Sequence, residues 1–266
     1  MKIALGVEYN GVRYCGWQTQ ASGCAVQDHL QTALSKIAEH AVQVVCAGRT
    51  DSGVHAIEQV VHFETNVTRP LSAWVRGTNA NLPNDIVALW AHPVGEGFHA
   101  RFSAKSRRYR YVLLNRSQRP ALNAGRVGWY HQPLDVDAMQ RAAQGFVGRR
   151  DFSAFRSAEC QAKSPVKSVH SFTVERRNDC VVFDIHADGF LHHMVRNLVG
   201  SLVYVGSARG DADWVVGLLE SRDRRLAPPT FAPDGLYLTQ IEYDAGWLLP
   251  QRNMSESHEL IGALTL

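Results

Sequence analysis

Asp51 is the first residue in this chain whose type and setting suit chemistry, because it stands in a short turn between two strand-like segments, 43–47 and 59–64. Two glycines bracket the turn, and glycine permits both unusual backbone angles and the close approach of a ligand. An aspartate is ionised at neutral pH, and Arg49, two residues earlier, favours that charged form inside a pocket. The local pattern is equally typical of a structural turn in which Asp51 hydrogen-bonds to its own backbone.

Other side chains offer rival chemistries. His192 and His193, with His186 and Asp188 nearby, suggest a metal site. Adjacent residues on a helix point about 100° apart, however, and the helical ligand pattern H-x-x-x-H is absent, which argues against a metal hydrolase. The strand–turn–helix motif G-x-S-x-G of a serine hydrolase is absent as well. A non-catalytic RNA-binding protein remains an alternative, and Asp51 discriminates, since an acid gives a phosphate-binding cleft no advantage.

Basic and aromatic residues alternate in one region of the chain. The formal net charge is only +3, so the distribution of charge is more informative than its sum. Side chains of both kinds on strand-like sequence can neutralise phosphates and stack on bases, which predicts RNA binding. The alternative is a solvated edge strand protected by its charges. The residues concerned are Arg101, Phe102, Lys105, Arg107, Arg108, Tyr109, Arg110, Tyr111, Arg116 and Arg119. A second cluster, Arg222, Arg224 and Arg225, is also consistent with the polar end of a helix.

The composition is that of an ordinary globular protein. Of the 266 residues, 45% are hydrophobic and 20% charged, enough for one large core or two modest ones. No apolar run approaches the roughly 18 residues of a membrane span, and no signal-peptide pattern is present, so we expect no membrane partner. Five scattered cysteines predict free thiols and a cytoplasmic location rather than a disulfide framework.

The elements that must position these residues follow the same order in both halves. Each half is predicted to run β-α-β-β-α-β, the ferredoxin-like order of an α+β fold. In the first half the expected strands are 2–10, 43–47, 59–64 and 85–90, with helices at 26–40 and 71–78. In the second half they are 107–114, 127–130, 168–176, 180–187 and 236–243, with helices at 136–147 and 191–204. We therefore expect domains at 1–104 and 105–246, followed by a C-terminal extension, 247–266.

Several blocks resemble the motifs of the tRNA pseudouridine synthase A family, in the family's order and over most of the chain. The segment 48–55 resembles G-R-T-D-A-G-V-H, with Ser52 where alanine is usual, and residues 16–18 resemble the family's G-W-Q turn. Further matches are F-H-A-R-F-S-A at 98–104, R-Y-R-Y at 108–111, F-x-H-H-M-V-R-N at 190–197 and G-L-Y-L at 235–238.

The resemblance implies an isomerase that converts uridine to pseudouridine at positions 38, 39 and 40 of the tRNA anticodon stem-loop. It implies two ferredoxin-like domains whose antiparallel sheets join across a central cleft, no metal or other cofactor, and a cytoplasmic homodimer. Asp51 matches the catalytic carboxylate and Arg196 its basic partner. Tyr109 matches the tyrosine that stacks on the target base, Leu236 an apolar wall and Arg49 a contact to the substrate nucleotide. From the residues alone, Tyr109 and Leu236 are also typical of half-buried strand and core positions. His99 and His193 fit motifs without an assigned role.

Overall fold

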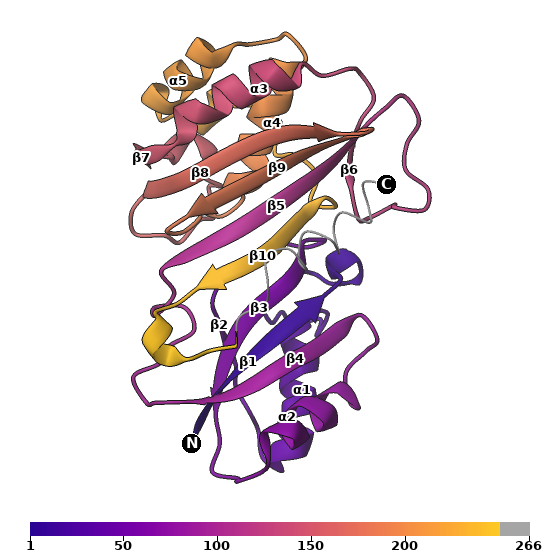
Figure 1. Cartoon of the computed structure of the whole chain (residues 1–266), viewed down its shortest axis with the longest axis vertical. Coiled ribbons are helices and arrows are strands. Elements are labelled where there is room, and N and C mark those ends of the chain that lie inside the picture. The colour runs from indigo at the N-terminus through magenta and orange to yellow at the C-terminus, as the bar shows by residue number, and fades with distance from the viewer. Residues whose placement is uncertain (251–266) are drawn as a thin grey trace. The chain divides into compact units, whose positions relative to one another are not determined.

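The computed structural model describes residues 1–250, which form two compact units. Among these residues, unit 1 comprises 1–105 and 237–250, and unit 2 comprises Ser106–Leu236. The described chain contains five α-helices and ten strands, nearly all paired antiparallel, which confirms the expected α+β class (Figure 1). Within residues 1–250 no helix combines the length and apolar character that a bilayer crossing requires.

Unit 1 is built around the strand β3, which is buried along almost its whole length. Strand β1 pairs antiparallel with β3 and β4, β2 pairs antiparallel with β3, and β10 pairs parallel with β3. The two helices pack against each other beside this sheet (Figure 1). The strands are β1 (Lys2–Tyr9), β2 (Val45–Cys46), β3 (His55–Glu64), β4 (Ile86–Val94) and β10 (Leu236–Glu242), and the helices are α1 (Val26–Ala38) and α2 (Leu71–Asn79).

Helix α1 shows how local sequence sets these elements. The Asp28 carboxylate accepts a hydrogen bond from the Ala25 backbone N–H at 3.0 Å, which satisfies a donor at the helix start. Val26 and Leu30 begin a buried stripe at helical spacing. The helix ends at Glu39, whose φ of 57° is left-handed.

Unit 2 has its own sheet, in the order β5-β9-β8-β7, with β6 added parallel to β5. The helices α3, α4 and α5 pack together beside it (Figure 1). The strands are β5 (Ser106–Asn115), β6 (Gly128–Tyr130), β7 (Gly148–Asp151), β8 (Val166–Arg177) and β9 (Cys180–Ala187), and the helices are α3 (Val136–Ala143), α4 (Met194–Gly206) and α5 (Ala212–Ser221). Helix α4 is buried on almost every side, and its Gly200 lies so close to the Pro229 carbonyl that a Cβ there would be 3.0 Å from it.

The expectation of five free thiols is wrong for two of them. Cys15 and Cys24 form a disulfide, with Cα atoms 5.6 Å apart. The backbone brings them together, because the Cys15 N–H donates to the Cys24 carbonyl at 3.1 Å. A separation of nine residues with no second pair gave no sign of this bridge in the sequence. The other three cysteines, Cys46, Cys160 and Cys180, are free and buried.

Candidate functional site

Asp51 lies half-buried on the loop that joins β2 to β3, and Arg49 on the same loop is exposed. A backbone hydrogen bond from the Val54 N–H to the Asp51 carbonyl, 3.2 Å long, closes the turn. Gly53 adopts a φ of 79°, which a residue with a side chain takes up only with strain.

Both neighbours of Asp51 are tied to the segment after β1. The Thr50 carbonyl accepts a hydrogen bond from the Trp17 N–H at 3.0 Å, and its hydroxyl lies 2.8 Å from the buried Tyr9 hydroxyl. The Ser52 hydroxyl donates to the Tyr14 carbonyl at 3.1 Å. The serine that departs from the usual alanine therefore adds a hydrogen bond beside Asp51 without entering the core.

Close backbone packing holds the same loop from the other side. A Cβ on Gly11 would lie 2.0 Å from the Val54 carbonyl oxygen, so only glycine fits there. The Gly11 N–H donates to Nδ1 of His55 at 3.1 Å, and the His55 ring stacks on Tyr237 with centroids 4.5 Å apart. The Asp51 loop (residues 47–54) is thus fixed through its backbone.

Two arginines supply positive charge near the start of this loop. Burial raises the pKa of the Cys46 thiol to about 12, and the charges of Arg49 and Arg101 partly oppose that shift. Arg101, which follows β4, therefore acts on the same strand end as Arg49.

The other three predicted site residues belong to unit 2. Tyr109 lies on β5, paired with Ile185 of β9, and only 8% of it is exposed. Its ring meets the edge of Phe190 at a centroid distance of 5.0 Å and an angle of 82°. Leu236, at the start of β10, is buried, in keeping with an apolar wall or a core position.

Arg196 lies in the first turn of α4 and is half-buried. Its Nε donates to the Phe231 carbonyl at 2.8 Å. The segment that contains Phe231 is also bound to β5, since the Tyr111 hydroxyl donates to the Ala232 carbonyl at 2.9 Å. One connecting segment, residues 227–235, therefore links the strand of Tyr109 with the helix of Arg196.

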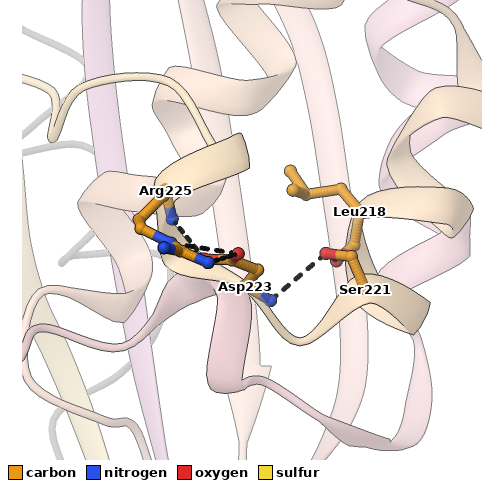
Figure 2. A network of polar contacts seen from close by, with 4 residues as sticks. All are labelled: Leu218, Ser221, Asp223 and Arg225. Atoms are coloured by element: carbon orange, nitrogen blue, oxygen red, sulfur yellow. Dashed lines mark hydrogen bonds and ion pairs between the residues drawn. The ribbon is translucent and has the colours of Figure 1, made fainter.

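One arginine of the second basic cluster, Arg224, holds that segment in place. Arg224 donates to the carbonyls of Ala227 and Pro228 and to the Asn197 side-chain oxygen, at 2.9 to 3.1 Å. Figure 2 shows the different setting of Arg225, whose guanidinium turns back onto Asp223 at 2.6 Å. Its charge is compensated locally, as expected for the polar end of a helix. Sequence reasoning missed the structural role of Arg224, although the two prolines that follow it, Pro228 and Pro229, are typical of a loop.

Only some residues of the predicted basic and aromatic region are exposed to solvent. Arg110 is buried and forms two hydrogen bonds to the Asp184 carboxylate, at 2.8 and 2.7 Å, and Tyr111 is fully buried. These two are wrong as RNA contacts: neighbouring residues of a strand point to opposite faces of the sheet, and β5 is buried on both faces at this point. Arg101 and Phe102, before the strand, are exposed.

The histidine pair also differs from expectation. His192 and His193 precede α4, which begins at Met194, instead of lying on the helix. His193 has a left-handed φ of 63°, and the two rings lie 4.0 Å apart. Helical geometry therefore does not separate the two rings, contrary to the expectation from the sequence.

Comparison with known proteins identifies what this arrangement is similar to. A family model described as tRNA pseudouridine synthase matches residues 6–103 and 142–244. Among curated proteins, tRNA pseudouridine synthase A of Aromatoleum aromaticum is 59% identical over 250 residues, covering 94% of this chain and 95% of that protein. The protein of the same name from Dechloromonas aromatica is 56% identical over 253 residues, covering 95% and 97%.

Proposed function

The chain belongs to the tRNA pseudouridine synthase family, and on that premise we propose that it acts at positions 38, 39 and 40 of the tRNA anticodon stem-loop with Asp51 as its catalytic carboxylate. The observation that carries this proposal is the fixed setting of Asp51. The residues before and after it are both hydrogen-bonded to the segment 9–17, while Asp51 itself is half-buried and follows the exposed Arg49 by two residues. Such preorganisation is what catalysis by a positioned group requires.

The reaction is an isomerisation that needs no redox step. The bond between C1′ of the ribose and N1 of uracil breaks, the base turns, and C1′ bonds to C5. The proton on C5 is lost and N1 regains one, so atoms and electrons balance. A carboxylate serves this chemistry either by attacking as a nucleophile or by stabilising positive charge on the sugar. As a nucleophile, Asp51 would lie against the ribose C1′ or the base. As a stabiliser of positive charge, it would lie beside C1′.

The remaining residues are assigned roles that follow the family resemblance. Arg196 is the basic partner of the carboxylate, and a guanidinium suits two parallel hydrogen bonds to a carboxylate. Tyr109 stacks on the target base, which must leave its helical stack to react. Its contact with Phe190 supports this role by fixing the ring in advance. Leu236 forms an apolar wall, and Arg49 contacts the substrate nucleotide or its neighbouring phosphate.

We also propose two ferredoxin-like domains (1–104 and 105–246) joined across a cleft, and a cytoplasmic homodimer that requires no cofactor. The modest net charge of +3 supports the dimer, because two copies double the phosphate contacts available to one tRNA. The order β1-α1-β2-β3-α2-β4 in unit 1 supports the domain assignment.

Tritium release from tRNA carrying C5-tritiated uridine tests the proposal, in the presence of a chelator. Wild-type protein should release tritium, and Asp51→Asn should release none while it still binds tRNA. Asp137→Asn is the matched control, because Asp137 is an exposed aspartate in the first turn of α3. It should release tritium at the wild-type rate. Mapping the product within the anticodon stem-loop then tests positions 38, 39 and 40.

Three results would contradict the proposal. Turnover by Asp51→Asn would remove the aspartate from the chemistry. Loss of wild-type activity on chelation would revive a metal-dependent reaction. Tight tRNA binding without any tritium release by the wild type would favour a non-catalytic RNA-binding protein, and in that case Asp51→Asn should bind more tightly.

A further inference from the structure

Phe102 is a large apolar side chain that the fold leaves in solvent. Its relative exposure is 76%, whereas the nearby Phe98 is fully buried. Phe102 lies on the connection between β4 and β5, next to the exposed Arg101. Single exposed apolar residues are common on protein surfaces, so exposure alone has no functional meaning. The contacts of this ring distinguish it.

The Phe102 ring has two defined neighbours on the same connection. It stacks on the His99 ring with centroids 4.2 Å apart and planes 26° apart. The Arg101 guanidinium carbon lies 5.7 Å from the Phe102 centroid, within cation–π range. We call these three side chains the Phe102 platform. It presents an ordered aromatic surface next to a positive charge.

Backbone hydrogen bonds make the platform rigid. Nδ1 of His99 accepts hydrogen bonds from the N–H groups of both Arg101 and Phe102, each 3.2 Å long. The Ser103 N–H donates to the His99 carbonyl at 2.8 Å, and the His99 N–H donates to the Ser103 hydroxyl at 3.0 Å. Because the ring is already ordered, a ligand that stacks on it has little conformational entropy to remove.

The platform is connected to the strands that carry the Asp51 loop. The His99 ring lies 4.9 Å from the buried His62 ring, and His62 Nδ1 accepts a hydrogen bond from the Ala100 N–H at 3.1 Å. His62 belongs to β3 and pairs with Val45 of β2, one residue before the strand ends in the Asp51 loop. Arg101 and Arg49 both act on Cys46 at that strand end.

We propose that the Phe102 platform binds a nucleotide of the tRNA other than the target uridine, with the base stacked on Phe102 and the adjoining phosphate bound by Arg101. This inference rests on the proposed function. Base stacking on an aromatic ring tolerates any base, and a guanidinium suits a phosphate, so the subsite adds affinity without reading sequence. The nucleotide it takes has an unpaired or unstacked base, because a base inside a helix has no free face.

The test compares two replacements of Phe102 in the full-length protein, with affinity for unmodified tRNA measured at fixed salt. Phe102→Leu keeps an apolar side chain but removes stacking, and should weaken binding about 10-fold, within a range of about 5- to 100-fold. Phe102→Tyr keeps the ring and should bind within about twofold of wild type. Leu122→Ala, which alters another exposed apolar residue, is the control and should change nothing.

The salt dependence separates the two parts of the platform. Arg101→Gln should lower the slope of log Kd against log salt by about one, and Phe102→Leu should leave that slope unchanged. Tritium release by the same preparations reports the proposed function separately from affinity. Wild-type tRNA affinity in a folded Phe102→Leu protein would overturn the inference. A change of oligomeric state that accounts for the lost affinity would also overturn it, because the platform would then contact a second copy of the chain.

Discussion

The Asp51 loop in unit 1 and the start of α4 in unit 2 are held in contrasting ways. The Asp51 loop is fixed by its own backbone, through glycine contacts and hydrogen bonds from neighbouring segments. The start of α4 is held largely by charged side chains, since Arg224 joins Asn197 to the segment 227–231 and Arg196 donates to the Phe231 carbonyl. Close backbone packing tolerates little displacement, whereas a guanidinium contact is lost when its charged side chain is replaced. The two regions should therefore respond differently to substitution.

We expect the largest loss of stability and turnover where the backbone is packed too closely to accept a side chain. Gly11→Ala places a Cβ 2.0 Å from the Val54 carbonyl, so the Asp51 loop must shift. We expect a loss of about 3 kcal/mol of unfolding free energy and loss of turnover, measured by denaturant unfolding and tritium release. Gly217→Ala, on the open side of α5, is the control and should be neutral or stabilising by about 0.5–1 kcal/mol. Equal behaviour of the two variants would contradict the packing argument.

Arg224→Gln tests whether side-chain contacts hold the start of α4 in unit 2. It removes the fork that donates to two carbonyls and to Asn197, and burial already lowers the pKa of Arg224. Hydrogen bonds from a charged donor of this kind predict a loss of about 2–3 kcal/mol, with a lower kcat. Arg225→Gln, which breaks only the exposed pair with Asp223, should leave stability and turnover unchanged. An unaltered Arg224→Gln protein would show that the segment 227–231 is held by other contacts.

Acidification should weaken unit 1 through His62. Burial, reinforced by the charges of His99 and Lys2, lowers the pKa of His62 to about 4, below its ordinary value of about 6.5. The unfolded chain therefore binds the proton first, so stability falls between about pH 6.5 and pH 4 and levels off below that range. At pH 5 the protonation of His62 in the unfolded chain lowers the free energy of unfolding by about 2 kcal/mol relative to neutral pH. The pH series is measured by urea unfolding, and His62→Gln should lose that part of the slope.

Tyr9→Phe gives the smallest expected effect and separates side-chain from backbone contacts at the Asp51 loop. It removes one hydroxyl from the buried hydrogen bond to Thr50, while the Trp17 N–H still holds the Thr50 carbonyl. We expect a loss of about 1 kcal/mol in stability and a modest fall in kcat with unchanged tRNA affinity. A fall as large as that of Gly11→Ala would show that the side chain, and not the backbone, positions the loop.

Much of the local structure could be predicted from periodicity. The helix expected at 26–40 is α1 (Val26–Ala38), and the strand expected at 180–187 is β9 (Cys180–Ala187). Helix α5 was missed, because its apolar residues give no clear amphipathic stripe, and so was the short strand β7, which is largely exposed. The predicted extension, 247–266, lies mostly outside the described residues.

In the candidate site, too, some features follow from local sequence and others depend on packing. A turn with glycines around Asp51 is a local property, and the sequence alone located it between two strands and within a set of family motifs. Residues before α4 were placed on the helix, because a left-handed residue such as His193 is set by packing and not by propensity. The disulfide between Cys15 and Cys24 was also missed, because a backbone hydrogen bond that the sequence does not reveal brings the two residues together.

Arg101 and Arg110 show where sequence information ends. Both stand in one basic and aromatic run, and the sequence by itself determined their types, their spacing and the family to which the run belongs. Only the tertiary structure decided that Arg110 is buried against Asp184 while Arg101 stays in solvent beside Phe102. The reason is physical: a charge can enter a core only where the fold brings a counter-charge to it, and that partner lies on another strand.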